Sequence, residues 1–226
     1  LIDGAVIKLN DVKQREIFGF TSKFPKWAIA FKFEAQELST KLKDVVWQVG
    51  RTGKLTPIGI IEPVELAGAT VQKATLNNMG DIIRKNVQIN SYVFVRRSNE
   101  VIPEILGLAR KSDDSKEIVA PTHCPSCNTE LIEVGANLFC PNYYCPEQID
   151  DRITHFASRD AMDIEGVSDK TVDQFREKLG VKTIADLYYL TREDLFTLDN
   201  FKDKKVDNYF RQLEKSKNIS LQKFIY

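Results

Sequence analysis

The four cysteines of the chain form two close pairs, and this pattern constrains the fold more than any other feature. Cys124 and Cys127 are separated by two residues, and Cys140 and Cys145 follow after a gap of twelve residues. Thiolates two residues apart lie on one side of a tight turn, and a second pair completes a tetrahedral site for Zn²⁺. Because all four ligands would be sulfur, the pattern predicts a structural zinc in a small ribbon, closed to substrate.

Two other uses of the cysteines stay open on the residues alone. Two disulfides would require an oxidising compartment, which no signal-peptide pattern in this sequence suggests. A redox-active Cys-x-x-Cys would not need the second pair. His123 adjoins Cys124 and is interpreted as a bystander rather than a ligand. The spacing favours zinc.

The cysteine cluster also divides the chain by charge. Residues 1–110 contain 16 Lys and Arg against 11 Asp and Glu, whereas residues 111–226 contain 16 against 21. The neutral total therefore combines a basic, strand-rich half with an acidic, helical half. Hydrophobic content of 42% and charged content of 28% are ordinary for a globular protein with two or three small domains. No run of eighteen apolar residues occurs, so no membrane-spanning helix is predicted.

Two alternating stretches near the N-terminus are predicted as strands that each carry a lysine. They are Ile2–Leu9, which includes Lys8, and Trp27–Phe33, in which Lys32 lies on the same face as two alanines. Small residues beside a lysine leave space for a ligand, and phosphate is the natural partner of an ammonium held there. The alternative is that both lysines are simply solvated.

Several motifs, taken in order, resemble those of the bacterial NAD-dependent DNA ligases. The resemblance covers essentially the whole chain, because the motifs run from the N-terminal strands through the four cysteines. The matching stretches before the cysteines are Asp3–Lys8, Trp27–Phe33, Val49–Gly53, Ala74–Asn78, Arg96–Arg97 and Val101–Pro103.

The resemblance implies roles for three residues in a nucleotide pocket. Asp3 and Lys8 would line the adenylate pocket, with Lys8 near the phosphate, and Lys32 would stabilise charge on the α-phosphate during adenylyl transfer. The family uses NAD and Mg²⁺, and Asp3 is a candidate participant in binding Mg²⁺. One feature departs from the family pattern. The covalent lysine belongs to Lys-x-Asp-Gly, but no lysine precedes Asp3-Gly4, the only Asp-Gly here. We expect the nucleophile and the nicotinamide-binding region upstream of Leu1, and no self-adenylation by this chain.

The region 41–110 is predicted to form an OB barrel, because it contains five short strands and one small helix, and the resemblance implies the same fold. The strands are expected at 45–49, at 55–64 with interruptions at Pro57 and Pro63, and at 69–76, 88–97 and 101–108, and the helix at 77–85.

OB barrels bind nucleic acid through their strand face and loops, which yields candidate DNA contacts. On the residues alone, the arginines could equally be solubilising side chains and the two apolar residues could belong to the core. With the resemblance, DNA contact is favoured, most strongly for Arg51 and Arg97. The candidates are Arg51, Lys54, Arg96 and Arg97 for phosphate, Thr52 as a hydrogen-bond donor, and Val101 and Ile102 against sugars in the minor groove.

The helical half contains two similar stretches 34 residues apart, Ile164–Lys170 and Leu198–Lys204. They are interpreted as two helix-hairpin-helix units, in which backbone amides at a helix start meet DNA phosphate. Gly166 of the first unit and Lys202 of the second are candidate DNA contacts. The second unit lacks the usual glycines, so ordinary helical packing remains the alternative for it.

The predicted architecture is a multidomain α+β chain. The expected parts are the end of an adenylation domain at 1–40, an OB domain at 41–110, a linker and four-cysteine zinc module at 111–149, and a partial helix-hairpin-helix region at 150–226.

The predicted function is part of an NAD-dependent DNA ligase that seals 3′-hydroxyl/5′-phosphate nicks in duplex DNA through enzyme–AMP and DNA–AMP intermediates, in replication and repair. The fragment would mainly clamp DNA, as a cytoplasmic monomer without membrane partners. The alternative is a non-catalytic nucleic-acid-binding module with an OB barrel and a zinc ribbon.

Overall fold

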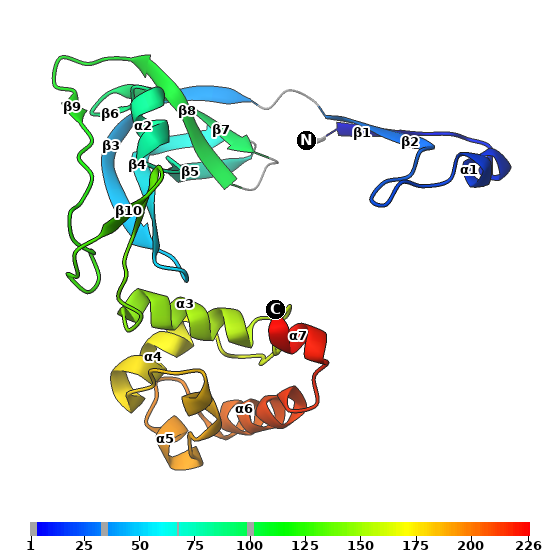
Figure 1. The fold of residues 1–226 in the computed structure, drawn as a ribbon, viewed down its shortest axis with the longest axis vertical. Helices are drawn as coiled ribbons and strands as arrows, with labels where there is room; N and C mark the ends of the chain where they lie inside the picture. Colours follow the sequence, from blue (N-terminus) through cyan, green and yellow to red (C-terminus); the bar gives the residue numbers. More distant parts are fainter. Residues whose placement is uncertain (1–3, 33–35, 67, 99–101) are drawn as a thin grey trace. The chain divides into compact units, whose positions relative to one another are not determined.

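The computed structural model describes residues 4–32, 36–66, 68–98 and 102–226, and the chain divides into two compact units. The first unit comprises Leu1–Val46 and Pro57–Val119, and the second comprises Trp47–Thr56 and Ala120–Tyr226. Most elements of both are labelled in Figure 1. The tip of one long β-hairpin, Trp47–Thr56, therefore belongs to the same unit as the cysteines and the C-terminal helices.

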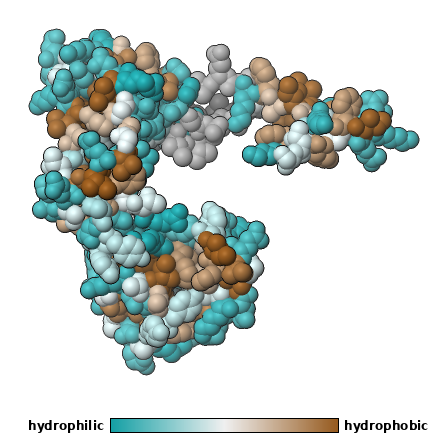
Figure 2. All heavy atoms as spheres, in the orientation of Figure 1, coloured by the Kyte–Doolittle hydropathy of each residue, from teal (hydrophilic) through white to brown (hydrophobic). Residues whose placement is uncertain are grey.

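The first unit begins with an antiparallel pair of strands, β1 (Gly4–Lys8) and β2 (Ala28–Lys32), joined through helix α1 (Val12–Phe18). Many apolar side chains of this segment lie at the surface, as Figure 2 shows, and Ile7 and Ile29 are 64% and 67% exposed. Both strands occur where the alternation predicts them.

Five strands close into a barrel, as predicted. Their order is β4–β3–β7–β8–β5, and β5 also pairs with β4, which completes the closure. The pairing of β5 with β8 is parallel, and β3–β7, β4–β5 and β7–β8 are antiparallel. The bounds are β3 (Glu37–Val49), β4 (Lys54–Leu66), β5 (Ala69–Thr75), β7 (Tyr92–Ser98) and β8 (Ile102–Arg110).

The barrel core consists of alternate side chains from these strands. Leu42, Ile61, Val95 and Ile105 are at most 2% exposed. Gly59 makes the close packing possible, because a Cβ at this position would lie 2.7 Å from Ile105 Cδ1 and 2.9 Å from Leu42 Cδ1. The strand period of two therefore directs one face of each strand into a single interior.

Strand β4 runs unbroken through Pro57 and Pro63, so the prediction that these residues interrupt it is wrong. The register between β4 and β5 shifts between Ile60 and Val64, and an irregularity of this kind accommodates Pro63. The carbonyl of Pro57 accepts a hydrogen bond from the Leu76 amide at 2.9 Å. Proline removes only a donor, so pairing through its carbonyl continues.

The stretch predicted as one strand at 88–97 forms two strands, β6 (Gln88–Ile89) and β7. They are separated at Asn90, which has a left-handed φ of +65° and donates its amide to the Leu42 carbonyl at 2.7 Å. β6 pairs with β9 (Lys116–Glu117), which lies in the segment predicted as a linker. That segment is therefore partly ordered against the barrel.

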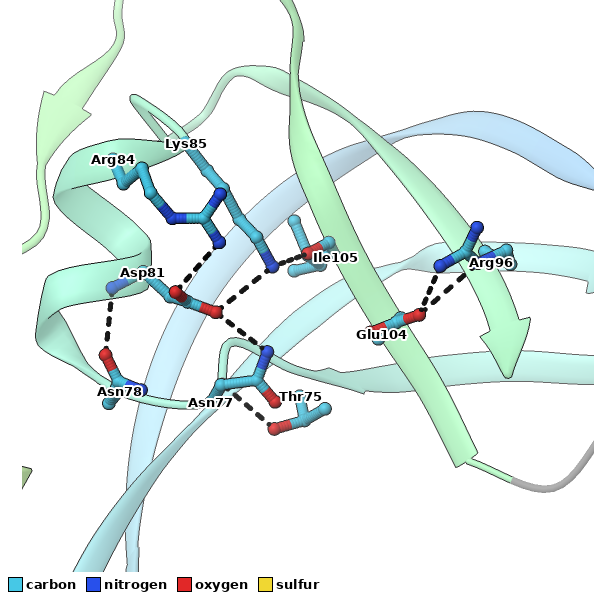
Figure 3. A network of polar contacts seen from close by, with 9 residues as sticks. All are labelled: Thr75, Asn77, Asn78, Asp81, Arg84, Lys85, Arg96, Glu104 and Ile105. Carbon is cyan, nitrogen blue, oxygen red and sulfur yellow. Dashed lines mark hydrogen bonds and ion pairs between the residues drawn. The ribbon is translucent and has the colours of Figure 1, made fainter. Parts of the chain in front are cut away.

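Helix α2 (Met79–Arg84) follows β5 and is held by a polar network (Figure 3). The side-chain amide of Asn77 donates to Asp81 Oδ2 at 3.1 Å, and Lys85 Nζ lies 3.5 Å from the same oxygen. Lys85 also donates to the carbonyl of Ile105 in β8 at 2.9 Å. The network attaches α2 to the barrel and gives Asn77, which lies just before the helix, a structural role.

The second unit begins with the β-hairpin tip and the cysteine-rich ribbon. Strands β10 (Ile132–Val134) and β11 (Asn137–Phe139) are antiparallel, and β11 pairs with the start of β4. A small apolar core lies between the hairpin tip and the ribbon. Its buried members are Val49, Leu55, Cys124, Leu138, Cys140 and Cys145.

The remainder of the second unit is helical, with one apolar core centred on Phe175, Leu187 and Leu195, which are fully buried. No helix in the part of the chain that the structure describes is long and apolar enough to cross a membrane. The helices are α3 (Pro146–Ala157), α4 (Asp169–Leu179), a 3₁₀ helix (Ala185–Tyr188), α5 (Arg192–Phe196), α6 (Asp203–Ser216) and α7 (Leu221–Ile225).

Candidate metal centre and nucleic-acid interface

The four cysteine sulfurs converge on one point, with all four within 4.8 Å of one another. Cys124 Sγ lies 3.9 Å from Cys145 Sγ, and Cys127 Sγ lies 3.5 Å from Cys140 Sγ. A tetrahedron with Zn–S bonds of about 2.3 Å has sulfurs about 3.8 Å apart. All four cysteines are free thiols. The number, chemistry and spacing of the donors therefore suit a closed tetrahedral metal site.

Local backbone turns bring each cysteine pair together. In the first pair, the Cys124 carbonyl accepts from the Asn128 amide at 2.9 Å, and the Cys124 amide donates to the Thr129 carbonyl at 2.8 Å. Asn128 has a φ of +56°, a left-handed conformation that asparagine tolerates well. In the second pair, the Cys145 amide donates to the Asn142 carbonyl at 3.0 Å. Both turns direct their thiols toward the shared centre.

The environment of the thiols alters their pKa values in opposite directions. Burial raises the pKa of Cys140 to about 12 and also raises the pKa of Cys145. Burial opposes ionisation of Cys127 as well, but hydrogen bonds with Thr129 outweigh it and lower the pKa of Cys127 to about 6. A bound cation would deprotonate the remaining thiols, because the thiolate is the ligand form.

The two predicted nucleotide lysines lie on one face of the β1–β2 pair. Lys8 is opposite Ala28, and Lys32 is opposite Gly4, and directly opposed residues of an antiparallel pair share a face. Only small side chains and Val6 lie between them on that face. Gly4 allows the two strands to approach, because a Cβ there would lie 2.4 Å from the Phe31 carbonyl oxygen. Asp3 lies outside the described residues.

A pocket of about 400 Å³ opens beside the β1–β2 pair, and its lining includes Lys8, Lys26 and Trp27. The guanidinium of Arg15 lies 4.9 Å from the centre of the Trp27 ring, and Phe20 contacts the ring edge-on. Cationic side chains and an aromatic face thus occur together at one end of the β1–β2 pair.

Arg51 and Thr52 lie exposed at the tip between β3 and β4. Asp151 of α3 is close enough to the tip for the backbone amide and the charge of Arg51 to lower its pKa. Burial and the neighbouring Asp169 raise the pKa of Asp151, while Arg51 opposes that change. Burial and the positive charge of Arg51 lower the pKa of His155, one turn further along α3. The tip is therefore in electrostatic contact with the helical part of its own unit.

The structure gives different surroundings to Arg96 and Arg97 of β7, which are both candidate phosphate contacts. Arg96 forms ion pairs with Glu104 at 2.9 Å and with Glu37 at 3.6 Å, its cross-strand neighbours on β8 and β3. The pair with Glu104 is drawn in Figure 3. Arg97 points to the opposite face, where it is paired in register with Pro103. Arg96 is therefore partly engaged in holding three strands together.

The two apolar candidates for minor-groove contact are not tested by the structure. Val101 lies outside the described residues. Ile102 begins β8, but its side chain lies outside the described part.

The two similar stretches of the helical half adopt one backbone course. We call Ile164–Ser168 the first turn and Leu198–Lys202 the second turn. In each, the amide of the fourth residue donates to the carbonyl of the first, at 3.4 Å and 3.3 Å. The third residue has a positive φ in both, +96° at Gly166 and +63° at Asn200. Sequence reasoning counted Asn200 against the motif because it stands where a glycine is usual, although asparagine tolerates this conformation.

Each turn leads directly into a longer helix. Ser168 precedes α4 and Lys202 precedes α6, both with extended backbone and neither with a side-chain hydrogen bond that caps the helix. First-turn amides of a helix lack intrahelical partners, and the helix start carries partial positive charge. Gly166 and Lys202 are exposed at these two places.

Two family models match the chain. Residues 39–117 match a model described as the NAD-dependent DNA ligase OB-fold domain, and residues 1–36 match one described as the NAD-dependent DNA ligase adenylation domain. The first agrees with the closed barrel, and the second covers the strands that carry the two lysines.

Curated relatives match along the whole chain. A DNA ligase of Clostridium botulinum strain Loch Maree is 56% identical over 227 aligned residues, which cover 100% of this chain and 34% of the relative. A DNA ligase of Clostridium tetani is 55% identical, and DNA ligase 2 of Clostridium acetobutylicum is 56% identical, with the same coverage. The chain thus spans about a third of the length of these relatives. On both kinds of match, it belongs to the NAD-dependent DNA ligase family.

Proposed function

We propose that this chain is the portion of an NAD-dependent DNA ligase that completes the nucleotide pocket and supplies much of the DNA clamp. The whole protein would seal 3′-hydroxyl/5′-phosphate nicks in duplex DNA in the cytoplasm, through enzyme–AMP and DNA–AMP intermediates. The observation that carries this proposal is the identity of 55–56% with DNA ligases over the entire chain. No resemblance to a different class of protein competes with it among these relatives.

The nucleotide role rests on the shared face of Lys8 and Lys32. Two ammonium groups over small residues can neutralise phosphate charge as an adenylyl group moves, which is the main contribution a protein makes to such a transfer. Mg²⁺ bound nearby would supply further positive charge, with Asp3 as a candidate ligand. The covalent lysine is not assigned to any residue of this chain, and we expect no lysine–AMP adduct when the chain alone is incubated with NAD and Mg²⁺.

The four cysteines would hold a structural Zn²⁺, since their sulfurs fill all four positions of a tetrahedron. Removing the metal should expose the small core that surrounds Leu55 and Leu138. Chelation is expected to lower amide protection in the ribbon and at the hairpin tip, as measured by hydrogen exchange. Unchanged protection after verified metal loss would contradict a structural role.

The DNA contacts would be made mostly to the backbone. In the barrel, Arg51, Thr52 and Arg97 are proposed as phosphate contacts, with Arg96 secondary because of its two ion pairs, and with Val101 and Ile102 against the sugars. In the helical part, we interpret the two turns with their flanking helices as helix-hairpin-helix units. Gly166 permits close approach in the first, and Lys202 supplies charge in the second. Such contacts predict affinity with little sequence preference.

The deciding experiment compares binding of the zinc-loaded chain to nicked and to intact duplex of the same sequence across a salt series. Tighter binding to the nicked duplex, with a steep salt dependence, is expected for a ligase clamp. Equal and salt-sensitive binding to both would favour the alternative, a non-catalytic nucleic-acid-binding module. Absence of binding at low salt would contradict a DNA clamp in this portion of the protein.

A further inference from the structure

The hairpin tip that carries Arg51 is attached to the cysteine cluster through its backbone. The Cys140 amide donates to the Gly53 carbonyl at 2.8 Å. The next two residues of β4, Lys54 and Leu55, pair with Phe139 and Leu138 of β11. The residues just after Arg51 thus continue the sheet of the ribbon, directly beside a metal-binding cysteine.

Gly53 shows how closely these backbones approach. Its φ is +80°, and a Cβ at this position would lie 2.4 Å from the Cys140 carbonyl oxygen and 2.9 Å from Gln148 Nε2. No residue with a side chain fits without displacing one of these groups. The tip therefore has little freedom to shift along the second cysteine turn or away from α3.

Gln148 connects the three parts. It is the third residue of α3 and only 5% exposed. Its side-chain amide donates to the carbonyls of Cys140 at 2.9 Å and Asn142 at 3.1 Å. Both donors of the amide are used, and the same nitrogen packs against Gly53. A buried amide with two satisfied donors fixes its neighbours in one arrangement.

The same face of α3 also holds Arg51 itself. Asp151, three residues after Gln148, and His155, four residues further, lie close enough to Arg51 for it to lower the pKa of each. Residues three and four apart share a helix face. Gln148 packs against Gly53 and Asp151 lies near Arg51, so this face of α3 borders the tip at both residues.

We propose that Gln148, together with Asp151, is a positioning residue that places Arg51 for contact with a DNA phosphate. The inference rests on the proposed function, because it requires Arg51 to contact DNA. Arg51 itself is exposed. A displaced tip should therefore cost DNA affinity through Arg51, while contacts made from the barrel strands are unaffected.

A double-mutant cycle tests this with the zinc-loaded chain and nicked duplex. Arg51→Ala should weaken binding about tenfold in the otherwise unchanged chain and lower the salt slope by about one. In the Gln148→Ala background, the same change should weaken binding less than about twofold, because Arg51 is already misplaced. Arg97→Ala should have its full effect in both backgrounds. Glu147→Ala, an exposed neighbour on α3, is the matched control and should leave the effect of Arg51→Ala unchanged.

Zinc content and the helical circular dichroism signal are measured for every variant. If Gln148→Ala loses zinc, the pair Asp151→Asn and Asp151→Ala replaces it, since neither contacts the cysteines. Asparagine keeps an acceptor for the Arg51 amide and should keep the full effect of Arg51→Ala, whereas alanine should abolish it. If Arg51→Ala weakens DNA binding by the same factor in both Asp151 variants, the inference is overturned.

The other outcomes separate the inference from the proposed function. If zinc is retained and the fold-losses of DNA affinity caused by Gln148→Ala and Arg51→Ala simply multiply in the double variant, the positioning role is refuted. The proposed DNA clamp is then unaffected. Binding that does not change on Arg51→Ala would remove Arg51 from the interface and overturn the inference, while the Arg97 contact stands. A chain that binds no DNA at low salt would contradict the proposed clamp and this inference with it.

Discussion

The first turn and the second turn of the helical part share one backbone course but differ in side-chain chemistry at two of their five positions. Gly166 in the first corresponds to Asn200 in the second, and Ser168 corresponds to Lys202. Positive φ at the third position and the same amide-to-carbonyl bond occur in both. The comparison shows that the conformation depends on one tolerant position and on buried apolar neighbours, and not on a fixed pair of glycines.

Each turn is also held by the helix that follows the other turn. Gln174 of α4 accepts the Asp199 amide at 2.7 Å, and Lys178 pairs with the Asp199 carboxylate at 2.7 Å. In the reciprocal contact, α6 holds Glu165 of the first turn. There, Asn208 donates to the Glu165 carbonyl at 3.5 Å and Gln212 to its carboxylate at 3.1 Å. The contacting residues of the two helices are again 34 positions apart, so the symmetry extends from the backbone to the contacts between the units.

The largest expected difference between the turns concerns their buried apolar residues. Phe201 is 6% exposed and packs against Phe175, whereas its counterpart Val167 is smaller and 9% exposed. Phe201→Ala should lower the free energy of unfolding of the helical part by about 3–5 kcal/mol, and Val167→Ala by about 1–2 kcal/mol. Urea denaturation followed by helical circular dichroism measures both. Equal losses would mean that the turns do not depend on their own apolar residue.

The next difference concerns the left-handed position. Gly166→Ala and Asn200→Ala should each cost about 1–2 kcal/mol, because alanine is strained at positive φ. At Gly166 the cost is conformational, since a Cβ there meets nothing closer than Asn208 Nδ2 at 3.7 Å. Asn200→Gly should change stability by less than about 0.5 kcal/mol. A large loss in Asn200→Gly would show that the asparagine side chain, and not its backbone, is required.

The reciprocal contacts should differ in strength, because their geometry differs. Gln174→Ala removes a hydrogen bond of 2.7 Å and should cost about 1 kcal/mol. Asn208→Ala removes a bond of 3.5 Å and should cost about 0.5 kcal/mol or less. The same denaturation assay ranks the two. A larger effect of Asn208→Ala would contradict the ranking by distance.

The smallest effect on stability, and the one that tests function, concerns charge. Lys202 is exposed, so Lys202→Ala should leave unfolding unchanged but lower the salt slope of DNA binding by about one. Ser168→Ala, at the equivalent place in the first turn, should change neither. An unaltered salt slope in Lys202→Ala would remove the second turn from the DNA interface.

Sequence patterns predicted the elements that depend on local periodicity. The cysteine spacing predicted the convergence of four sulfurs, alternation predicted β1 and β2, and short apolar stretches predicted the five barrel strands. One of them, β3, begins at Glu37, eight residues before the expected start at residue 45. Asn90 divided a predicted strand, because a single left-handed residue changes the chain direction without altering the hydrophobic pattern. Pro57 and Pro63 remained inside β4, because the effect of a proline depends on whether its missing amide would have been paired.

In the candidate site, too, some features follow from local sequence patterns and others only from tertiary contacts. The sequence indicated both Arg96 and Arg97 as candidate phosphate contacts and, with the resemblance, favoured Arg97. The two carboxylates that engage Arg96, Glu37 and Glu104, lie on neighbouring strands, where the strand register brings them opposite it. Nothing local indicated that Gln148 would contact Gly53, since 95 positions separate them. Contacts of this kind are set by the register of strands and by the packing of helices, which single-residue patterns do not encode.

By itself, the sequence determined the convergence of four thiols, the strand and helix periods and the family of this chain, because these depend on residue type and short spacing. The tertiary structure alone decided that the tip with Arg51 belongs with the cysteine ribbon and α3, that Arg96 is engaged in ion pairs, and that the two turns hold each other. The physical reason is that these features arise from groups brought together across long stretches of chain, where burial and geometry, and not neighbouring residues, select the partner.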